Sequence, residues 1–418
     1  MNEVSRTVVL RSAPLPRAVF RELEELEDVY RGMVEKLTIY AVENEVKSFT
    51  GLKAAKYHEM RDLHPELPSH YIYTACQDAA ARAKGFLRLK KRGRAKGDRP
   101  EVRRISIWLD DHLWAVDGHT SMKVATPGGW LEVELEPHRQ YWKYVNGGWR
   151  LAPEARIKLD RRNRRLRIYL TFAREVEEYE PNGFVPVDVN EDNVTALVGG
   201  APYLLETNVA KTTLGYYYRR RRIQEKYDGL YGPGSRAERK AMKGLGEREK
   251  RDDVRRKVAK IIVGAAQEVH GAVVLEELGE GPARGMISRI KNRQLRHRIF
   301  QAAFKGIQRA IEEEASERGV PVIHVDPRNT SRLCPVHNAP IIYENGSRVG
   351  RCSAGGERWH RDVAAVWNIY IRAGRGDGSD APSLSRPIVD GSHVPLGSTA
   401  AHDPIGIPES LWARWNSL

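Results

Sequence analysis

Three acidic residues end or follow apolar stretches that are spread over the C-terminal half of this 418-residue chain. Asp188 lies in Phe-Val-Pro-Val-Asp-Val-Asn, Glu276 in Ala-Val-Val-Leu-Glu-Glu-Leu, and Asp362 in His-Arg-Asp-Val-Ala-Ala. Carboxylates at strand ends and at a helix start can converge at one edge of a sheet. Converged carboxylates need a cation to stay ionised, and hard divalent ions such as Mg²⁺ bind through oxygen. Two such ions can hold the attacking and leaving oxygens of a phosphodiester, so the pattern indicates metal-dependent cleavage of nucleic acid.

Each acid alone also has a purely structural interpretation. Asp188 suits a turn, Glu276 or Glu277 an exposed strand end, and Asp362 a helix N-cap. The joint arrangement favours a site, because the apolar strands before Asp188 and Glu276 should be central and buried, where an unpaired charge is costly. An Asp, Glu, Asp order on a β-β-β-α…β…α chain is that of an RNase H-like fold.

Composition gives the class of partner. The formal net charge is +14 and the pI is about 9.6, a balance that favours nucleic acid first and an anionic membrane surface second. No apolar run reaches the roughly eighteen residues of a membrane span, and the start lacks the features of a secretory signal, so we expect a cytoplasmic protein. Three cysteines argue against a disulfide framework, and Cys76 suits a helix interior as a small buried hydrophobe.

The N-terminal half predicts helices followed by a β-domain. Apolar residues recur at helical spacing in residues 17–46 and 69–89, so we expect residues 1–100 to be mostly helical. From 102 to 172 the period changes to two, which predicts a small antiparallel barrel with the helical segment placed before it or inserted in it. The polar stretch 174–181 is the clearest domain boundary.

The C-terminal half alternates strands and helices, which is typical of an α/β sheet. We expect strands at 185–189, 194–198, 203–207, 273–275 and 320–325. A helical hairpin is expected at 214–269, broken by glycines at 229–234, and helices are expected to end at Arg318 and to span 363–373. The segment after 374 is rich in Gly, Ser and Pro and is expected to be a flexible tail.

Several basic segments are candidates for nucleic-acid contact. A run of Lys and Arg can also be a solvated helix face, but glycines and Pro100 make the region after residue 89 an arm suited to phosphates. The candidate nucleic-acid-binding residues are Arg88, Lys90, Lys91, Arg92, Arg219, Arg220, Arg221, Arg222, Arg289, Lys291, Arg293 and Arg296.

Four segments resemble the signature segments of TnpB proteins, which are transposon-encoded, RNA-guided DNA endonucleases similar to CRISPR type V effectors. They begin at Val187 (Val-Asp-Val-Asn-Glu-Asp-Asn-Val), Val274 (Val-Leu-Glu-Glu-Leu), Thr330 (Thr-Ser-Arg-Leu-Cys-Pro) and Arg361 (Arg-Asp-Val-Ala-Ala-Val-Trp-Asn). The resemblance covers residues 180–373 well and the N-terminal half more loosely.

The resemblance implies that Asp188, Glu276 and Asp362 are the metal-binding triad of a RuvC-like nuclease that uses Mg²⁺ or Mn²⁺. It also implies a multidomain α/β protein. Its expected parts are a β-barrel wedge domain at 1–180 with a helical recognition insertion at about 15–100, an RNase H-like (RuvC) domain at 181–325 and 356–375, a zinc-ribbon-like, target-binding insertion at 326–355 and a tail at 376–418.

The Cys-Pro-x-His knuckle departs from the family pattern, in which Cys-x-x-Cys is followed by a second Cys-x-x-Cys that completes a tetrahedral zinc ribbon. The first pair here is Cys334 and His337, and the second begins at Cys352 but ends at Gly355, which has no side chain. His360 is the nearest substitute, and a water could also complete the set. His360 is equally open to a place beside the metal-binding acids or to phosphate contact. A ribbon that keeps its fold without metal is the alternative, and any zinc is expected to be structural.

The leading hypothesis is therefore an RNA-guided, metal-dependent endonuclease that cuts double-stranded DNA beside a short motif, with guide RNA and target DNA as partners. The alternative is a catalytically silent RNA-guided DNA-binding protein on the same scaffold. A strand-transfer or junction-resolving enzyme is a third reading, disfavoured by the interposed knuckle. A ribosome-associated protein suits the charge but does not explain the triad.

Overall fold

The computed structural model describes residues 2–95, 97–278, 291–292, 304–344 and 346–376. The chain divides into two compact units, one of Glu3–Glu175 and the other of Met1–Asn2 with Val176–Leu418. The division falls at the end of a long strand, beside the polar stretch 174–181. Within the described ranges, no helix has the length and apolar character needed to cross a membrane.

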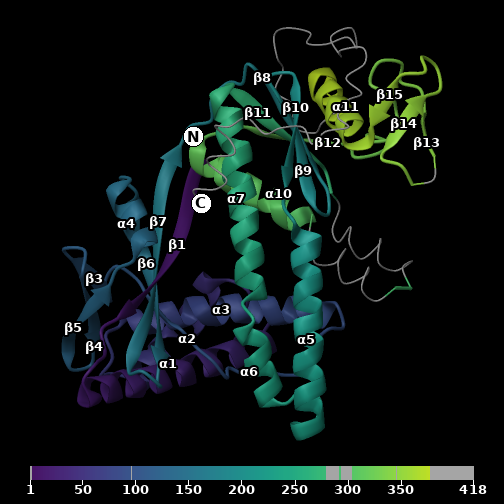
Figure 1. Ribbon diagram of the computed structural model, residues 1–418. Coiled ribbons are helices and arrows are strands. Elements are labelled where there is room, and N and C mark those ends of the chain that lie inside the picture. Colours follow the sequence, from purple (N-terminus) through teal and green to yellow (C-terminus); the bar gives the residue numbers. More distant parts are fainter. Residues whose placement is uncertain (1, 96, 279–290, 293–303, 345, 377–418) are drawn as a thin grey trace. The chain divides into compact units, whose positions relative to one another are not determined.

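The first unit is built on a nearly closed, barrel-like sheet of seven strands in the order β2-β6-β7-β1-β5-β4-β3 (Figure 1). The strands are β1 (Asn2–Ser12), β2 (Ile107–Leu109), β3 (Trp114–Asp117), β4 (Ser121–Thr126), β5 (Gly129–Glu136), β6 (Arg150–Asp160) and β7 (Arg165–Val176). The sequence analysis expects the first hundred residues to be mostly helical and does not predict β1, which buries Val8 and Leu10 by strand alternation. The helices that follow β1 are therefore an insertion between two strands of one sheet.

Three helices make up this insertion: α1 (Arg17–Glu43), α2 (Phe49–Leu63) and α3 (His70–Lys91). The buried face of α1 carries Leu23, Leu26, Tyr30 and Leu37, which recur at helical spacing as the sequence predicts. Tyr30 meets Tyr71 of α3 edge to face, with ring centroids 6.2 Å apart. Helix α2 was not predicted. A fourth helix, α4 (Arg139–Asn146), joins β5 to β6.

The second unit contains a five-stranded sheet in the order β10-β9-β8-β11-β12. Its strands are β8 (Gly183–Val189), β9 (Asn193–Val198), β10 (Ala201–Glu206), β11 (Gly271–Glu276) and β12 (Val322–Val325). Strands β8 to β10 form an antiparallel meander, and β11 runs parallel to both β8 and β12. All five strands lie where the sequence predicts them, and the arrangement is the expected RNase H-like one.

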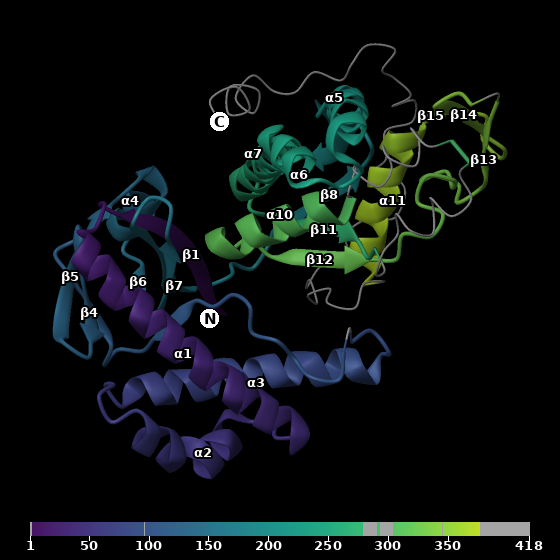
Figure 2. The same ribbon diagram turned by 90° about the horizontal axis from the view of Figure 1, so that it is seen from below.

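Helices cover both faces of this sheet. The helical hairpin consists of α5 (Val209–Tyr231), α6 (Arg236–Gly244) and α7 (Glu247–Glu268). Helices α7 and α10 (Phe304–Arg318) pack on one face, where Ile262 and Ile311 join the core around Val185 and Val273. Helix α11 (Arg361–Arg375) packs on the other face, where Ile369 contacts the core of the sheet (Figure 2). The sheet is thus buried on both sides, as parallel neighbours require.

A small antiparallel sheet stands between β12 and α11, and we call it the knuckle sheet. Its strands are β13 (Ile341–Tyr343), β14 (Val349–Cys352) and β15 (Arg358–His360), in that order. Its core includes Trp359, which is buried in one cluster with Val363 and Trp367 of α11. Helix α11 begins directly after β15, so the knuckle sheet fixes where this helix starts.

Candidate functional site

Asp188 and Glu276 lie on neighbouring parallel strands. Asp188 is near the end of β8 and Glu276 is the last residue of β11. The register pairs Val274 with Pro186, and the same offset two residues further on brings Glu276 level with Asp188. Both strands are apolar before the acid because they are buried between helices. The carboxylates therefore emerge together at the carboxyl edge of the sheet.

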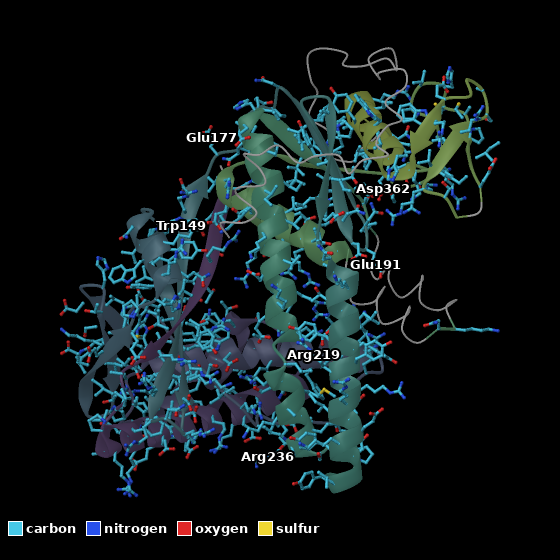
Figure 3. All side chains as sticks on the ribbon, in the orientation of Figure 1. Trp149, Glu177, Glu191, Arg219, Arg236 and Asp362 are labelled. Carbon is cyan, nitrogen blue, oxygen red and sulfur yellow. The ribbon has the colours of Figure 1, made fainter. Side chains whose placement is uncertain are left out.

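Asp362 does not lie on the sheet but in the first turn of α11 (Figure 3). Its side chain is 1% exposed, and α11 packs against β8. The first turn of a helix favours a carboxylate, since free backbone N–H groups point that way. Packing of α11 on the sheet thus brings the third acid toward the first two.

The charges of Glu276 and Asp362 act on the carboxyl group of Asp188. Burial raises the pKa of Asp188 to about 7, and the charges of Glu276 and Asp362 add to that rise. The amide of Asn190 donates to Asp188 over 2.8 Å and works in the opposite direction. Burial also raises the pKa of Glu276. An oxygen-only group of acids that resist ionising together fits a hard divalent cation.

Arginines compensate the charge of Asp362. Arg348 Nη1 donates to Asp362 Oδ2 over 2.9 Å, and Arg361 Nε lies 3.3 Å from Oδ1. Arg348 comes from the loop that precedes β14, so the knuckle sheet contributes directly to the acid site. Among the described residues, the carboxylate oxygens of the three acids do not all lie within 4.8 Å of one another.

Two polar residues that the sequence analysis did not assign hold this site together. The Thr330 hydroxyl donates to Glu276 Oε1 over 2.7 Å. The Asn368 side-chain amide donates to the backbone carbonyls of Thr330, Leu333 and Ala364 at 2.8, 2.8 and 3.0 Å. Asn368 therefore fastens α11 to the segment that positions Thr330 beside Glu276. A buried amide on an otherwise apolar helix face is the signal that could have found it.

The knuckle brings two cysteines, a histidine and a glutamate into one group. Ligand atoms of Cys334, His337, Cys352 and Glu357 all lie within 4.8 Å of one another. Glu357 was not predicted. His360, the predicted substitute for the missing cysteine, is not in this group: it precedes α11 as its N-cap. Burial lowers the pKa of the His360 imidazole, while the charge of Asp362 acts against that change.

A second group of potential ligands lies in the first unit. His70, Asp110 and His112 also have ligand atoms within 4.8 Å of one another. The rings of His70 and His112 stack with centroids 3.8 Å apart, and His70 Nδ1 is hydrogen-bonded to Asp110 Oδ2 at 2.6 Å. Stacked rings present their nitrogens side by side and not toward a common centre. The ring stacking and the hydrogen bond therefore account for the closeness of these three side chains without a metal ion.

The predicted basic residues fall on two helices and on segments beyond the described ones. Arg88, Lys90, Lys91 and Arg92 are exposed at the C-terminal end of α3, which continues two residues past the expected end. Lys291 is exposed. Arg289, Arg293 and Arg296 lie outside the described residues, as does most of the tail predicted beyond residue 374.

The four arginines Arg219–Arg222 on α5, of which Arg219 is labelled in Figure 3, differ in their contacts. Arg220 pairs with Glu247 at 3.1 Å and Arg221 with Glu225 at 2.8 Å. The Arg219 guanidinium lies over the Tyr216 ring, 5.4 Å from its centroid. Within the described part of the chain, no carboxylate lies within 4.0 Å of the Arg219 or Arg222 guanidinium.

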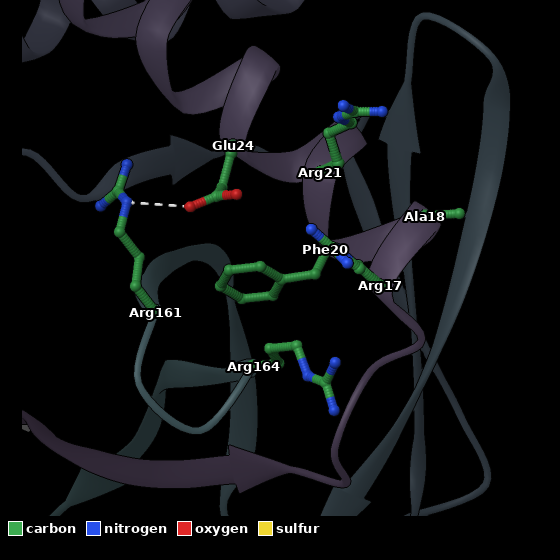
Figure 4. Close-up of a pocket in the computed structure, with 7 residues that line it drawn as sticks. All are labelled: Arg17, Ala18, Phe20, Arg21, Glu24, Arg161 and Arg164. Atoms are coloured by element: carbon green, nitrogen blue, oxygen red, sulfur yellow. Dashed lines mark ion pairs between the residues drawn. The ribbon is translucent and has the colours of Figure 1, made fainter.

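A basic pocket of about 610 Å³ in the first unit was not predicted as a site (Figure 4). It lies between the start of α1 and the turn that joins β6 to β7. Arg161 is held there by Glu24 at 3.0 Å. The remaining arginines that line it are Arg17, Arg21 and Arg164.

Two family models match parts of the chain. Residues 304–369 match the Cas12f1-like TNB domain, and residues 26–124 match the uncharacterized protein MJ0013 family. The uncharacterized protein MJ0857 of Methanocaldococcus jannaschii is 28% identical over 243 residues, which cover 54% of this chain and 89% of that protein. The TnpB-like protein MJ0751 of the same organism is 27% identical over 281 residues, which cover 62% of this chain and 93% of that protein.

Two solved structures share the fold over most of the chain. A Cas12f1–sgRNA–target DNA complex matches with a TM-score of 0.58 at 13% identity and covers 88% of this chain and 99% of that one. The mini-RNA-guided endonuclease CRISPR-Cas_phi3 matches with a TM-score of 0.51 at 9% identity and covers 88% and 92%. These likenesses concern the fold: a barrel-like domain and a RuvC-like C-terminal domain with a zinc-finger-like insert.

Proposed function

Since the chain fits the TnpB family, we propose that it is an RNA-guided, divalent-metal-dependent DNA endonuclease encoded by a transposon, cutting target DNA beside a short motif. The observation that carries this proposal is the buried Asp188 at the edge of an RNase H-like sheet, whose pKa is raised by burial and by the charges of Glu276 and Asp362. Burial and like charge raise the pKa of Asp188 to about 7, which is a cost that a bound cation removes. A strongly shifted group of this kind is typical of a functional site.

The three carboxylates would hold Mg²⁺ or Mn²⁺ through their oxygens. A divalent ion bound there supplies an activated water and stabilises the departing phosphate oxygen. Side chains of this protein position the three acids and compensate their charge. Thr330 orients Glu276 by its hydroxyl, Asn190 orients Asp188, and Arg348 provides positive charge beside Asp362.

Guide RNA and target DNA are the proposed partners. Phosphate contact supplies most of the affinity of such proteins, and the exposed cations of α3 and α5 are available for it. The basic pocket beside α1 offers guanidinium groups in a concave setting, which suits a backbone phosphate. Base pairing with the guide would read the target sequence, so these contacts need no base specificity.

A catalytically silent DNA-binding protein is the second candidate, favoured by one observation. Asp362 is paired with Arg348 and Arg361, and the three acids are not gathered within 4.8 Å among the described residues. If these ion pairs persisted in the complex, target binding would remain while cleavage would be lost.

A matched pair of adjacent acids separates the two candidates. The protein is purified with RNA co-expressed from its own flanking DNA, and cleavage of a target library is measured with Mg²⁺, with Mn²⁺ and with chelator. Glu276→Gln should lower cleavage by at least about 100-fold with target binding retained, because it removes a metal ligand. Glu277→Gln is the control, since Glu277 is exposed on the same strand end and should leave cleavage unchanged.

Metal-dependent cleavage by the wild type that disappears only in the Glu276 variant supports the nuclease. Guide-directed binding with no cleavage in either metal supports the silent protein. Equal cleavage by both variants would remove this acid site from the mechanism.

A further inference from the structure

The knuckle contains a glutamate in the place of its missing cysteine. The turn that follows β14 reads Cys352-Ser-Ala-Gly-Gly-Glu357. It is closed by two backbone hydrogen bonds between its ends, from Cys352 N to Glu357 O at 2.8 Å and from Gly356 N to Cys352 O at 3.0 Å. The positive φ of 77° at Gly356 permits this tight reversal. The turn therefore brings the Glu357 side chain back toward Cys352.

The space at Gly355 is already taken. A Cβ added at Gly355 would lie 2.1 Å from Glu357 Oε1 and 2.2 Å from His337 Cε1. Contacts this short are impossible, so residue 355 can carry a side chain only if both Glu357 and the His337 ring move. The carboxylate of Glu357 thus occupies the volume into which a cysteine at position 355 would project.

The separations between ligand atoms match those around one tetrahedral ion. Zinc bonds of about 2.3 Å to sulfur and about 2.0 Å to nitrogen or oxygen place tetrahedral N and S ligands roughly 3.5 Å apart, and N and O ligands roughly 3.3 Å apart. His337 Nδ1 lies 3.8 Å from Cys334 Sγ and 3.6 Å from Cys352 Sγ. It lies 3.3 Å from Glu357 Oε1.

The second carboxylate oxygen points to a cation as well. Glu357 Oε2 is buried and has no hydrogen-bond partner among the described residues. Two buried cysteines adjoin it, and neither supplies a strong donor. A buried carboxylate beside two thiols is costly unless a positive charge is present.

We propose that Glu357 replaces the fourth thiolate and that Cys334, His337, Cys352 and Glu357 hold one structural zinc ion. His360, the last residue of β15, is not part of this group. Zinc in this position would tie the turn after Thr330 to β14 and β15, and so would fix the knuckle sheet from which α11 begins. The inference concerns metal content and stability and does not depend on the proposed nuclease activity.

The test measures zinc directly in the full chain. The wild-type protein, purified without chelator, should contain about one zinc per chain by elemental analysis. Competition with a chromophoric chelator should show that Glu357→Gln weakens zinc binding at least about tenfold, since the amide is a poor ligand. Glu344→Gln is the matched control: Glu344 is exposed in the same knuckle and should leave the affinity unchanged.

A second variant keeps the proposal falsifiable if Glu357→Gln fails to fold. Glu357→Cys replaces the carboxylate with a third thiolate and leaves Gly355, where a side chain would also meet the His337 ring, unchanged. It should bind zinc at least as tightly as the wild type, and after replacement by Co²⁺ its thiolate-to-cobalt absorption should rise by about half.

Well under one zinc per chain in the wild type would overturn the proposal, as would equal zinc affinity in Glu357→Gln and Glu344→Gln. Either result stands whether or not the protein cuts DNA.

Discussion

At the scale of single residues, the ionised form of Asp188 destabilises the metal-free folded protein. Its ordinary pKa of 3.8 is raised to about 7 by burial first and by the charges of Glu276 and Asp362 next. An acid whose pKa rises on folding binds more proton in the folded state than in the unfolded one between these two values. Stability of the metal-free protein should therefore fall as pH rises from about 4 to about 7.

Asp188→Asn should consequently stabilise the metal-free protein at pH 8 while abolishing cleavage. Each pKa unit corresponds to about 1.4 kcal/mol, so the gain should be on the order of a few kcal/mol at pH 8 and near zero at pH 4. Thermal unfolding with chelator at both pH values measures it. Adding Mg²⁺ at pH 8 should stabilise the wild type and not the variant. A variant less stable than the wild type at pH 8 with chelator would contradict this account of the site.

At the scale of elements, the acid site depends on how α11 is anchored. Thr330 reaches Glu276, and Asn368 of α11 holds the backbone carbonyl of that same threonine. Arg348 reaches Asp362 from the loop that leads into β14. The knuckle therefore touches two of the three acids, one by a hydroxyl and one by a guanidinium. Folding of the knuckle and geometry of the acid site should change together.

Arg348→Gln tests this connection. Asp362 is 1% exposed and Arg348 is 49% exposed, so the loss leaves a buried carboxylate whose one remaining cationic partner among the described residues is Arg361. With chelator at pH 8, stability should fall by about 1 to 3 kcal/mol. Because the guanidinium competes with a cation for Asp362, the Mg²⁺ concentration for half-maximal cleavage should also fall.

Arg351→Gln serves as the control for that variant, since Arg351 is exposed on β14 of the same knuckle sheet. Unfolding curves with chelator and Mg²⁺ titrations of cleavage are compared for both. If both substitutions behaved alike, Arg348 would have no role at Asp362.

The strands and acids could be predicted because their signals are local. Apolar runs of four or five residues mark β8 and β11, and an acid directly after each run is visible in the sequence. Strand β1 was missed since its partner is distant: Arg11 pairs with Glu136. Helix α2 was missed because only Leu52 and Met60 are buried along it. Glu357 could not be found from ligand spacing, because only the closed turn returns it to the cysteines.

At the scale of the whole molecule, the count of 69 Lys and Arg residues overstates the cations available to a polyanion. Arg82 forms an ion pair with Asp78 on the same helix, and Arg161 forms one with Glu24. Among the described residues, three other arginines of the pocket beside α1 and two arginines of the α5 run form no ion pair with a carboxylate. Affinity for RNA should therefore depend on which arginines lack a carboxylate partner, not on how many arginines a segment contains.

The α5 run offers a test in which the number of removed charges is held constant. In one variant Arg219 and Arg222 become Gln, and in the other Arg220 and Arg221 do. Each removes two positive charges from the same helix, but only the second pair is neutralised by Glu247 and Glu225. The first variant should weaken guide-RNA binding more and reduce the slope of log K against log salt by roughly 1.5, as expected for two lost phosphate contacts. The second variant should change this slope by less than half of that amount.

Binding isotherms over a several-fold range of salt concentration measure the slope for both variants. Equal slopes would mean that α5 contacts RNA only through its overall charge.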